Sequence, residues 1–478
     1  MAKTVRTTGK KKVRRDSSKV APVKAKKAFS NYQEALAYLL EKTDYEKEEH
    51  VRYNGSTFSL ERMEKLLSLL GDPHTKINTV HIAGTKGKGS TATMLAKMLE
   101  ANGYTVGLYT SPHVVHLHER IVINSRMISD AEMLAMMNRL YAPVEKLTKN
   151  GGAPTFFEIM TALAFTYFAD RRIDIGVIET GLGGRLDSTN VIVPKVVGIT
   201  SLSIDHKRQL GDTLDRIAME KAGVFKRGVP VITVQQDPVA LNVLKAQSLA
   251  VKAPLSITGT DIDFSYRFET SREHGPHTRI CLSTATSKFE HLRVPLHGRH
   301  QAINCGLALA LLDKLKTSGY EIDSEKSAEG LSSVILAGRM EMICRDPRVM
   351  IDGAHNAASI RALVHAIGQN IPYDSMVMIF GCNSDKDIPG MLAELQYGAD
   401  KVIFTRSNSL KAVSPQELAD MYTELCGKMC QVANTLGEAL QLARSAVGRE
   451  DLICITGSFY LIGMAKSRFQ PALVPVAS

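Results

Sequence analysis

Cysteine is absent from the first 280 residues of this 478-residue chain, although seven cysteines follow between positions 281 and 454. None forms a C-x-x-C pair, and Cys426 and Cys430, one helical turn apart, have no companion histidines. This pattern argues against a zinc site and favours reduced thiols in a cytoplasmic protein. The chain also lacks any apolar run near the roughly 18 residues that cross a bilayer, so we expect no membrane-spanning segment.

Acidic residues are nearly absent from positions 1–30, which hold eleven Lys and Arg against Asp16 alone. Because this segment carries +10, the formal net charge of +10 for the whole chain leaves residues 31–478 neutral. We expect a disordered, solvated basic tail with few large apolar residues. A contact for polyanions and an organelle transit peptide stay open as alternatives, but the apolar core of a secretory signal is missing.

The remaining chain is long enough for two domains. Apolar spacing predicts helices over 32–40 and 60–70. Strand-like segments then alternate with helical ones, for example Ile173–Glu179 after one helical stretch and Val196–Asp205 before the next. This alternation predicts an α/β domain with a mostly parallel sheet covered on both faces.

Residues 255–295 change to short alternating runs, which predict antiparallel strands added to the main sheet, followed by a helix over 301–315. From residue 347, four strand-like runs each precede a helical stretch and predict a smaller Rossmann-like α/β domain. We therefore expect a tail over 1–30, a central domain over 31–336, a linker over 337–343 and a second domain over 344–478.

Residues 79–91, TVHIAGTKGKGST, place a β-branched run before three glycines and two lysines. The run predicts a strand that ends at Gly84, and the periodic segment from Ser90 predicts a helix. A glycine turn at a helix N-terminus directs backbone N–H groups and the helix dipole at one point, which favours a bound phosphate. Lys88 adds a cation for that phosphate, and Ser90 or Thr91 adds a hydroxyl.

The loop is shorter than the full G-x-x-x-x-G-K-[ST] pattern, because Ile82 stands where the first glycine is required. A purely structural turn therefore stays open beside the phosphate site. The flanking strand, helix and hydroxyl residues favour the phosphate site.

Eight motifs follow one another in chain order: FSLERMEKLLSLLGDPHTKINTVHIAGTKGKGS, YTSPHV, ETGLGGRLDSTNV, SIDH, EKAGVF, HQAINC, GRMEMI and DGAHN. Together they resemble folylpolyglutamate synthases, which are often bifunctional with dihydrofolate synthase, in the Mur ligase superfamily. The resemblance spans residues 31–478 and excludes the tail. It implies a P-loop-containing α/β domain of Mur ligase type followed by a smaller Rossmann-like domain.

The resemblance implies an ATP-dependent carboxylate–amine ligase, acting as a monomer, that adds L-glutamate to a folate and in some members to dihydropteroate. The γ-phosphate of ATP passes to the substrate carboxylate, and the glutamate amine displaces phosphate from the acyl phosphate. Phosphorylation is needed because a carboxylate is a poor electrophile, so catalysis depends on positioning and charge neutralisation.

The family's metal positions map onto Ser111, Glu179, His206 and Lys221, and imply two Mg²⁺ sites, with Lys221 carried as a carbamate; a monovalent cation is a further expected ligand. From the residues alone, Glu179 ends a strand at the edge where ligands collect, although pairing with a nearby Arg stays open. His206 as an ordinary loop histidine and Lys221 as an exposed helical lysine also stay open.

The resemblance implies that nucleotide lies between the two domains, bound by ten positions: Gly84, Thr85, Lys86, Gly87, Lys88, Gly89, Ser90, Asn304, Arg339 and Asp352. It implies catalytic roles for Lys88, His206, Lys221 and His355. His355 and Asn356 would place the phosphoryl acceptor or the glutamate, with a strand-terminating turn as the alternative for both.

Positions that match the family's folate contacts are Thr57, Phe58, Ser59, Thr155, Phe156, Phe157, Glu158, Leu186, Asp187 and Ser188. An aromatic side chain there can stack on a flat heterocycle. Phe156 and Phe157 are equally consistent with core positions at the start of a helix.

Two features depart from the family pattern: the basic tail, and Lys86, where the family usually has Asn. Two alternatives to the folate ligase stay open. Another Mur-type ligase, such as a peptidoglycan precursor ligase, is disfavoured by the FSLERM and ETGLGGRLDSTNV motifs. A P-loop protein that binds nucleic acid through its tail is disfavoured by the neutral folded part, so we expect nucleic acid only at the tail.

Overall fold

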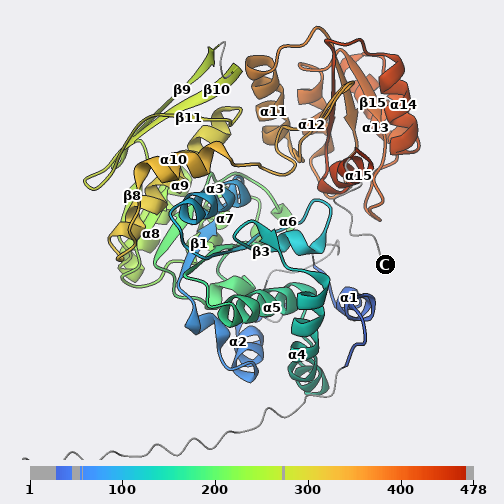
Figure 1. Ribbon diagram of the computed structural model, residues 1–478. Helices are drawn as coiled ribbons and strands as arrows, with labels where there is room; N and C mark the ends of the chain where they lie inside the picture. Colours follow the sequence, from blue (N-terminus) through green and yellow to red (C-terminus); the bar gives the residue numbers. More distant parts are fainter. Residues whose placement is uncertain (1–27, 46–53, 56, 272–274, 470–478) are drawn as a thin grey trace, which may run out of the picture.

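The computed structural model describes residues 28–45, 54–55, 57–271 and 275–469. Two α/β units lie one above the other, each built around its own sheet (Figure 1). The fold is thus the two-part α/β arrangement that the strand–helix alternation predicts. In the described part of the chain, no helix has the length and apolar character needed to cross a membrane.

An eight-stranded sheet forms the middle of the first unit, in the order β4-β3-β2-β5-β1-β6-β7-β8. Its strands are β1 (Thr79–Ala83), β2 (Val106–Tyr109), β3 (Ile121–Ile123), β4 (Arg126–Met127), β5 (Ile175–Glu179), β6 (Val196–Ile199), β7 (Val231–Thr233) and β8 (Leu255–Ile257). Only β3 and β4 run antiparallel to their neighbours. The four central strands are buried along their whole length, as expected for parallel strands covered on both faces.

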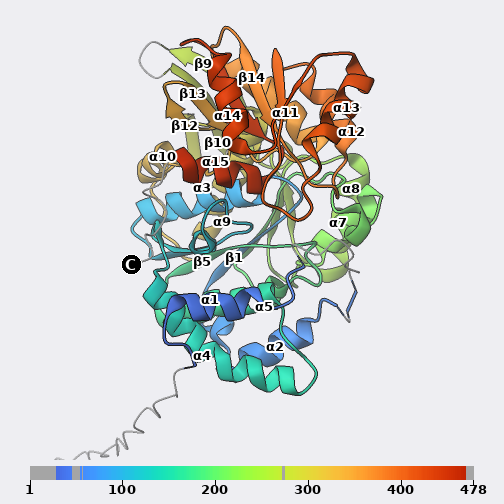
Figure 2. The same cartoon turned by 90° about the vertical axis from the view of Figure 1, so that its right-hand side faces the viewer.

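Helices cover both faces of this sheet, and Figure 2 shows one group between the sheet and the second unit and another below it. The lower group is α1 (Tyr32–Leu40), α2 (Leu60–Leu69), α4 (Asp130–Lys149) and α5 (Phe156–Asp170). The upper group includes α3 (Lys88–Ala101), α9 (Arg299–Lys316) and α10 (Ser324–Ser332). The remaining helical elements are η1 (Pro73–Lys76), η2 (Leu117–Arg120), η3 (Ser188–Val191), α6 (Lys207–Leu210), α7 (Leu214–Ala222) and α8 (Pro238–Val251).

Strands β9 (Asp263–Ser271), β10 (Gly275–Ser283) and β11 (Lys288–Val294) form a separate antiparallel sheet. The prediction that they extend the main sheet is therefore wrong. Phe264 and Tyr266, on one face of β9, pack against the core cluster that includes helix α9. A Cβ at Gly306 of α9 would lie 2.4 Å from the Phe264 ring. The alternating pattern thus marks a face that packs on a helix, rather than strands that pair with β8.

The second unit has a six-stranded sheet in the order β12-β13-β17-β14-β15-β16. Its strands are β12 (Glu341–Arg345), β13 (Arg348–Ile351), β14 (Met376–Phe380), β15 (Lys401–Phe404), β16 (Gln431–Val432) and β17 (Leu452–Thr456). Its helices are α11 (Ala357–Asn370), α12 (Ile388–Leu395), α13 (Pro415–Cys426), α14 (Leu436–Ser445) and α15 (Phe459–Phe469). The four predicted strands are confirmed, and β12 begins inside the segment predicted as a linker.

The fold begins earlier than the predicted end of the tail at residue 30. Phe29 is 7% exposed, and its ring lies 5.2 Å from Tyr38 and 5.3 Å from Tyr141. Aromatic packing therefore ties residues 28–30 to helices α1 and α4. Positions 1–27 of the predicted tail lie outside the described residues.

Candidate active site

A cavity of about 790 Å³ opens at the carboxyl ends of the central strands and is also lined by residues of the second unit. Ile82 of β1 pairs in register with Glu179 of β5, so the glycine loop after β1 and the end of β5 reach the same edge. Arg339, His355 and Tyr460 line the cavity from the second unit. Ligands collect at this edge in parallel α/β sheets, and the cavity joins both units around it.

The predicted phosphate loop leads directly into helix α3, which begins at Lys88, two residues before the predicted start. Gly87 has φ 90°, and a Cβ there would lie 2.1 Å from Asn304 Oδ1. A Cβ at Gly89 would lie 3.2 Å from Glu179 Oε2. Within the described residues, no side chain caps the first amides of α3. These close approaches and uncapped amides make the turn a fitting cradle for a phosphate.

The predicted ATP-binding residues surround the loop at two levels. Thr85, Lys86, Gly87, Lys88 and Gly89 line the cavity. Asn304 is 3% exposed and lies against the loop, where its side chain fills the space that a side chain at Gly87 would need. Gly84 packs against Thr200, and a Cβ at Gly84 would lie 1.8 Å from Thr200 Oγ1. Ser90 is buried in the first turn of α3.

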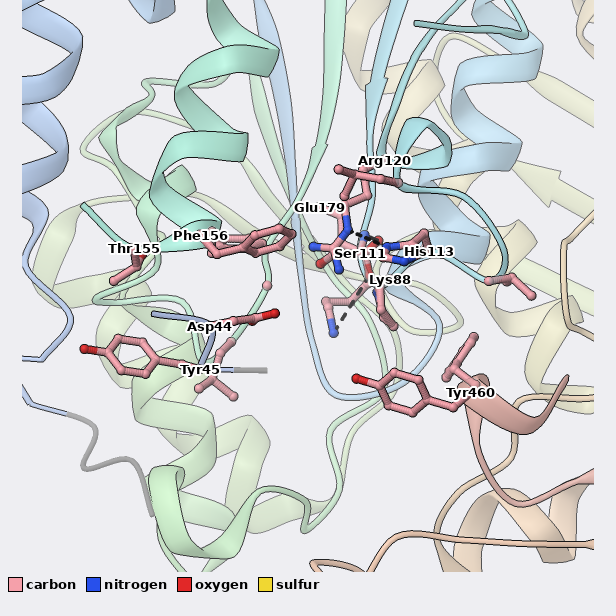
Figure 3. A pocket seen from close by; sticks show the side chains of 18 of the residues that line it. Asp44, Tyr45, Lys88, Ser111, His113, Arg120, Thr155, Phe156, Glu179 and Tyr460 are labelled. Carbon is pink, nitrogen blue, oxygen red and sulfur yellow. Dashed lines mark hydrogen bonds and ion pairs between the residues drawn. The ribbon is translucent and has the colours of Figure 1, made fainter. Parts of the chain in front are cut away.

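Figure 3 shows Lys88, Ser111 and Glu179 beside Arg120 and His113 at the centre of the cavity. The Ser111 N–H donates to Glu179 Oε2 at 3.0 Å, and Lys88 Nζ lies 4.0 Å from Glu179 Oε1. Arg120 is 1% exposed, and its Nε–H donates to His113 Nδ1 at 3.0 Å. Burial raises the pKa of Glu179, while nearby Lys88 and the Ser111 N–H act in the opposite direction.

The donor set suits a magnesium ion held partly by nucleotide. Ser111, Glu179 and His206 line one cavity and offer a hydroxyl, a carboxylate and an imidazole. Neither at this cavity nor elsewhere do the described residues contain a group of three or more His, Cys, Asp and Glu placed to hold a metal. Mg²⁺ typically takes one or two carboxylates and completes its shell with water and phosphate oxygens, so this sparse set fits it.

Lys221 lies on α7 behind the cavity and is 4% exposed, rather than on an exposed helix face. Its ammonium donates to Gly183 O at 3.5 Å. Burial, with Lys88 nearby, lowers the pKa of Lys221 to about 7. A large neutral-amine fraction near neutral pH is what carbamylation requires.

Arg339 and Asp352 form the junction of the two units. The Arg339 guanidinium lies over the Phe459 ring at 4.7 Å and faces the cavity. Buried Asp352 accepts the backbone N–H of Met340 at 2.9 Å and of Ala354 at 2.8 Å. Asp352 therefore fixes the chain around Arg339, and burial raises its pKa.

Lys86 and Lys88 face different sides of the loop. Lys86 Nζ donates to Asp205 Oδ2 at 2.7 Å and to His355 Nε2 at 2.9 Å. His355 Nδ1 lies 2.7 Å from the Gly353 carbonyl oxygen. A contact thus runs from the loop of the first unit to the second unit.

The predicted folate residues divide into cavity-lining and structural positions. Thr57, Phe58, Thr155, Phe156, Phe157, Glu158, Leu186, Asp187 and Ser188 line the cavity. Ser59 caps α2 by accepting the Arg62 N–H at 3.2 Å, and Thr155 caps α5. Phe156 is 2% exposed, as expected of a core position, although it also lines the cavity.

Two of these acids are already committed to the fold. Glu158 accepts the Arg62 Nε–H at 2.8 Å and the Thr155 N–H at 2.7 Å. Asp187 accepts the Leu182 N–H at 2.8 Å and the Thr189 N–H at 3.0 Å, and burial raises its pKa. Both carboxylates hold the wall of the cavity in shape.

Sequence reasoning missed several cavity residues: Tyr32, Gln33, His113, Arg120, Asp205, Lys386 and Lys411. His113 and Asp205 stand inside the quoted motifs YTSPHV and SIDH, which was the available signal. The others come from segments far apart in the chain, and no local pattern brings them together.

Comparisons with known proteins show which family the chain resembles. The Mur ligase middle domain matches residues 82–312, and the Mur ligase glutamate ligase domain matches residues 338–459. The dihydrofolate synthase/folylpolyglutamate synthase of Bacillus subtilis is 33% identical over 92% of this chain and all of its own length. The dihydrofolate synthetase of Saccharomyces cerevisiae is 31% identical over 84% of this chain and 96% of its own length.

Among solved structures, Mycobacterium tuberculosis folylpolyglutamate synthase complexed with ADP superposes with a TM-score of 0.84 at 32% identity. That match covers 92% of this chain and 98% of the other. With two Mur ligase domains and full-length relatives of this kind, the chain belongs to the folylpolyglutamate synthase/dihydrofolate synthase family of Mur ligases.

Proposed function

We propose that this enzyme ligates L-glutamate to a folate at the expense of ATP. The proposal rests on one cavity that is lined both by the uncapped N-terminus of helix α3 and by residues of the second unit. The family relatives named as folylpolyglutamate synthases support the same activity. An acyl phosphate forms first, and the glutamate amine then displaces phosphate.

The chain's own residues supply binding and charge neutralisation. The first amides of α3 and the Lys88 ammonium hold the phosphates, and Arg339 approaches from the second unit. Arg120 and Lys88 lie beside Glu179, so cationic groups meet where negative charge moves. The second unit lines part of the cavity, and we expect it to shield an acyl phosphate from water.

The metal and the modified lysine are part of the proposal. Ser111, Glu179 and His206 would hold Mg²⁺, which neutralises phosphate charge when bound. Lys221, buried and within the influence of Lys88, would carry a carbamate that adds an anionic oxygen ligand for a second ion. Intact mass before and after mild acid tests the carbamate, and a monovalent cation is tested by varying K⁺ at fixed Mg²⁺.

A second activity, the addition of glutamate to dihydropteroate, is supported by the names of the Bacillus subtilis and Saccharomyces cerevisiae relatives. Both acceptors share the pterin, and they differ in whether the reacting carboxylate belongs to the benzoate or to a glutamate. One cavity lined by Phe58, Phe157 and Leu186 can accept the same pterin in either case.

The experiment is ADP release by purified protein with MgATP and L-glutamate, comparing tetrahydrofolate, dihydropteroate and a muramyl peptide precursor as acceptors. We expect release with tetrahydrofolate, and release with dihydropteroate if both activities are present. Release that depends on neither pterin, or that depends on the muramyl precursor, would overturn the folate assignment.

We further propose a cytoplasmic monomer whose basic positions 1–27, the part of the predicted tail outside the described residues, take no part in ligation; a contact with polyanions is the alternative to a solvated tail. Retention on heparin with and without these positions tests the tail, and sedimentation tests the monomer. Equal ligase activity of both forms is expected.

A further inference from the structure

Lys86 lies in a contact that crosses between the two units. Its partners are 119 and 269 positions away in the chain: Asp205, after β6, and His355, between β13 and α11. The Asn356 amide adds a weaker contact to Asp205 Oδ2 at 3.4 Å. Three loops from the edges of two sheets therefore meet at one ammonium group.

The hydrogen bonds assign one form to His355. Its Nδ1 faces the Gly353 carbonyl oxygen at 2.7 Å, and a carbonyl can only accept, so Nδ1 carries the hydrogen. Nε2 is then a bare acceptor, and the Lys86 ammonium donates to it at 2.9 Å. Lys86 thus orients a neutral imidazole that lines the cavity.

The ion pair is sheltered from water. The Asp205 side chain is 9% exposed and the Lys86 side chain 28%, with Nζ and Oδ2 2.7 Å apart. Removing one member of a sheltered pair leaves the other charge poorly solvated, so such pairs stabilise the arrangement that forms them. Here the pair joins two loops of the first unit, and it holds Lys86 Nζ and Asp205 Oδ2 where they meet His355 and Asn356 of the second unit.

Lys88 provides the contrast. Its Nζ is 4.0 Å from Glu179 Oε1, within the same unit, and no cross-unit partner is recorded for it among the described residues. Two donor positions of Lys86 are already taken by Asp205 and His355, whereas Lys88 lies at the start of α3, where the phosphates are expected.

We propose that Lys86 is a positioning residue that ties the phosphate loop to the second unit through His355, with Asp205 of the first unit holding its ammonium in place, rather than a ligand of the nucleotide phosphates. The inference rests on the proposed function only in placing nucleotide at the loop. Domain closure is a recognised way to complete a site, and a cross-unit tie of this kind favours the closed state before ligands arrive.

The test compares full-length wild type with Lys86→Met and Asp205→Asn, and with Lys65→Met as a control that removes an exposed ion pair within α2. Two quantities are measured without folate or glutamate: the radius of gyration by X-ray scattering, and the Kd of ADP by calorimetry. Thermal melting verifies that each variant is folded.

We expect both Lys86→Met and Asp205→Asn to enlarge the ligand-free radius of gyration, and Lys65→Met to leave it unchanged. The Kd of ADP should change by less than about threefold in Lys86→Met, well short of the roughly tenfold or greater loss expected for a charge-assisted phosphate contact. An unchanged radius in Lys86→Met, or a loss of ADP affinity of about tenfold or more, would overturn the proposal.

Neither readout requires ligase activity, so failure of this inference is distinguishable from failure of the folate assignment. If Lys86→Met does not fold, Asp205→Asn decides the matter, because it leaves the Lys86 charge in place. An Asp205→Asn radius equal to that of wild type would then overturn the proposal.

Discussion

In both units a parallel strand runs into a helix at the edge of the same cavity, but the two helix N-termini differ. Helix α3, after β1, begins at Lys88 behind Gly87, and no side chain in the described part of the chain caps it. Helix α11, after β13, is capped by Asn356, whose side chain accepts the Ser359 N–H at 2.9 Å. In return, the Ser359 hydroxyl accepts the backbone N–H of Asn356. The first unit therefore offers backbone amides to a ligand, and the second offers side chains such as His355.

The largest expected effect tests the glycine that opens α3. Gly87→Ala should abolish ADP binding, because its Cβ would lie 2.1 Å from Asn304 Oδ1 and displace the loop. Gly319→Ala is the matched control, since its φ of 91° resembles the 90° of Gly87 but its Cβ meets no described atom within 4 Å. Calorimetry with ADP measures both.

Both substitutions carry the backbone penalty of a left-handed residue, roughly 1 kcal/mol, so both should lower the melting temperature slightly. Only Gly87→Ala should lose nucleotide. Equal ADP affinity in the two variants would contradict phosphate binding by the first amides of α3.

The next effect concerns the cation of the same cradle. Lys88→Ala should lower ADP release under saturating substrates by roughly 10²-fold or more, because a preorganised positive group is lost where phosphate charge develops. The fold should persist, as measured by circular dichroism. Lys65→Ala, at an exposed position of α2, is the control and should retain full activity. Near-normal turnover of Lys88→Ala would place the chemistry elsewhere.

Lowering the pH should destabilise the region of β1, the strand before α3, but not through β13, the strand before α11. His81 in β1 is 0% exposed, with Nε2 2.8 Å from the Thr189 hydroxyl, whereas β13 has no histidine. Burial lowers the pKa of His81 to about 3, below its ordinary value of 6.5. Between these values the unfolded chain binds a proton that the folded chain does not, so the free energy of unfolding falls as pH falls from 6.5 toward 3.

Comparing wild type with His81→Gln by denaturant unfolding at several pH values measures this loss. The stability difference between the two should shift by up to a few kcal/mol in favour of His81→Gln as the pH is lowered. A difference that stays constant between pH 7 and pH 4 would contradict a buried neutral His81.

The smallest effect is expected at the capped helix. Asn356→Ala should cost about 1 kcal/mol of stability, as is typical for loss of a helix cap, and leave the Kd of ADP close to that of wild type. Thermal melting and ADP calorimetry provide the two readouts. A loss of ADP affinity as large as that in Gly87→Ala would mean that the two helix ends serve the same purpose.

Local pattern was sufficient for much of the fold. The helix over 32–40 and the four strands of the second unit follow from apolar spacing and burial, and the structure confirms them. The sheet β9–β11 was misassigned because alternation specifies a half-buried strand but not its cover, which here is helix α9.

The sequence predicted the site only where all of the residues involved lie in one continuous segment. Glycine spacing and the following helix predict the phosphate loop. The roles of Asn304 under Gly87 and of Asp205 beside Lys86 depend on contacts between segments more than 100 residues apart, so no spacing rule reveals them.

The central claim is that nucleotide phosphates bind the uncapped amides of α3, and its most direct test is a crystal structure with a non-hydrolysable ATP analogue and Mg²⁺. The account predicts phosphate oxygens within hydrogen-bond distance of the amides of residues 87–90 and of Lys88 Nζ, with none at the capped start of α11. Phosphates located at α11, or density for the analogue away from residues 87–90, would contradict it.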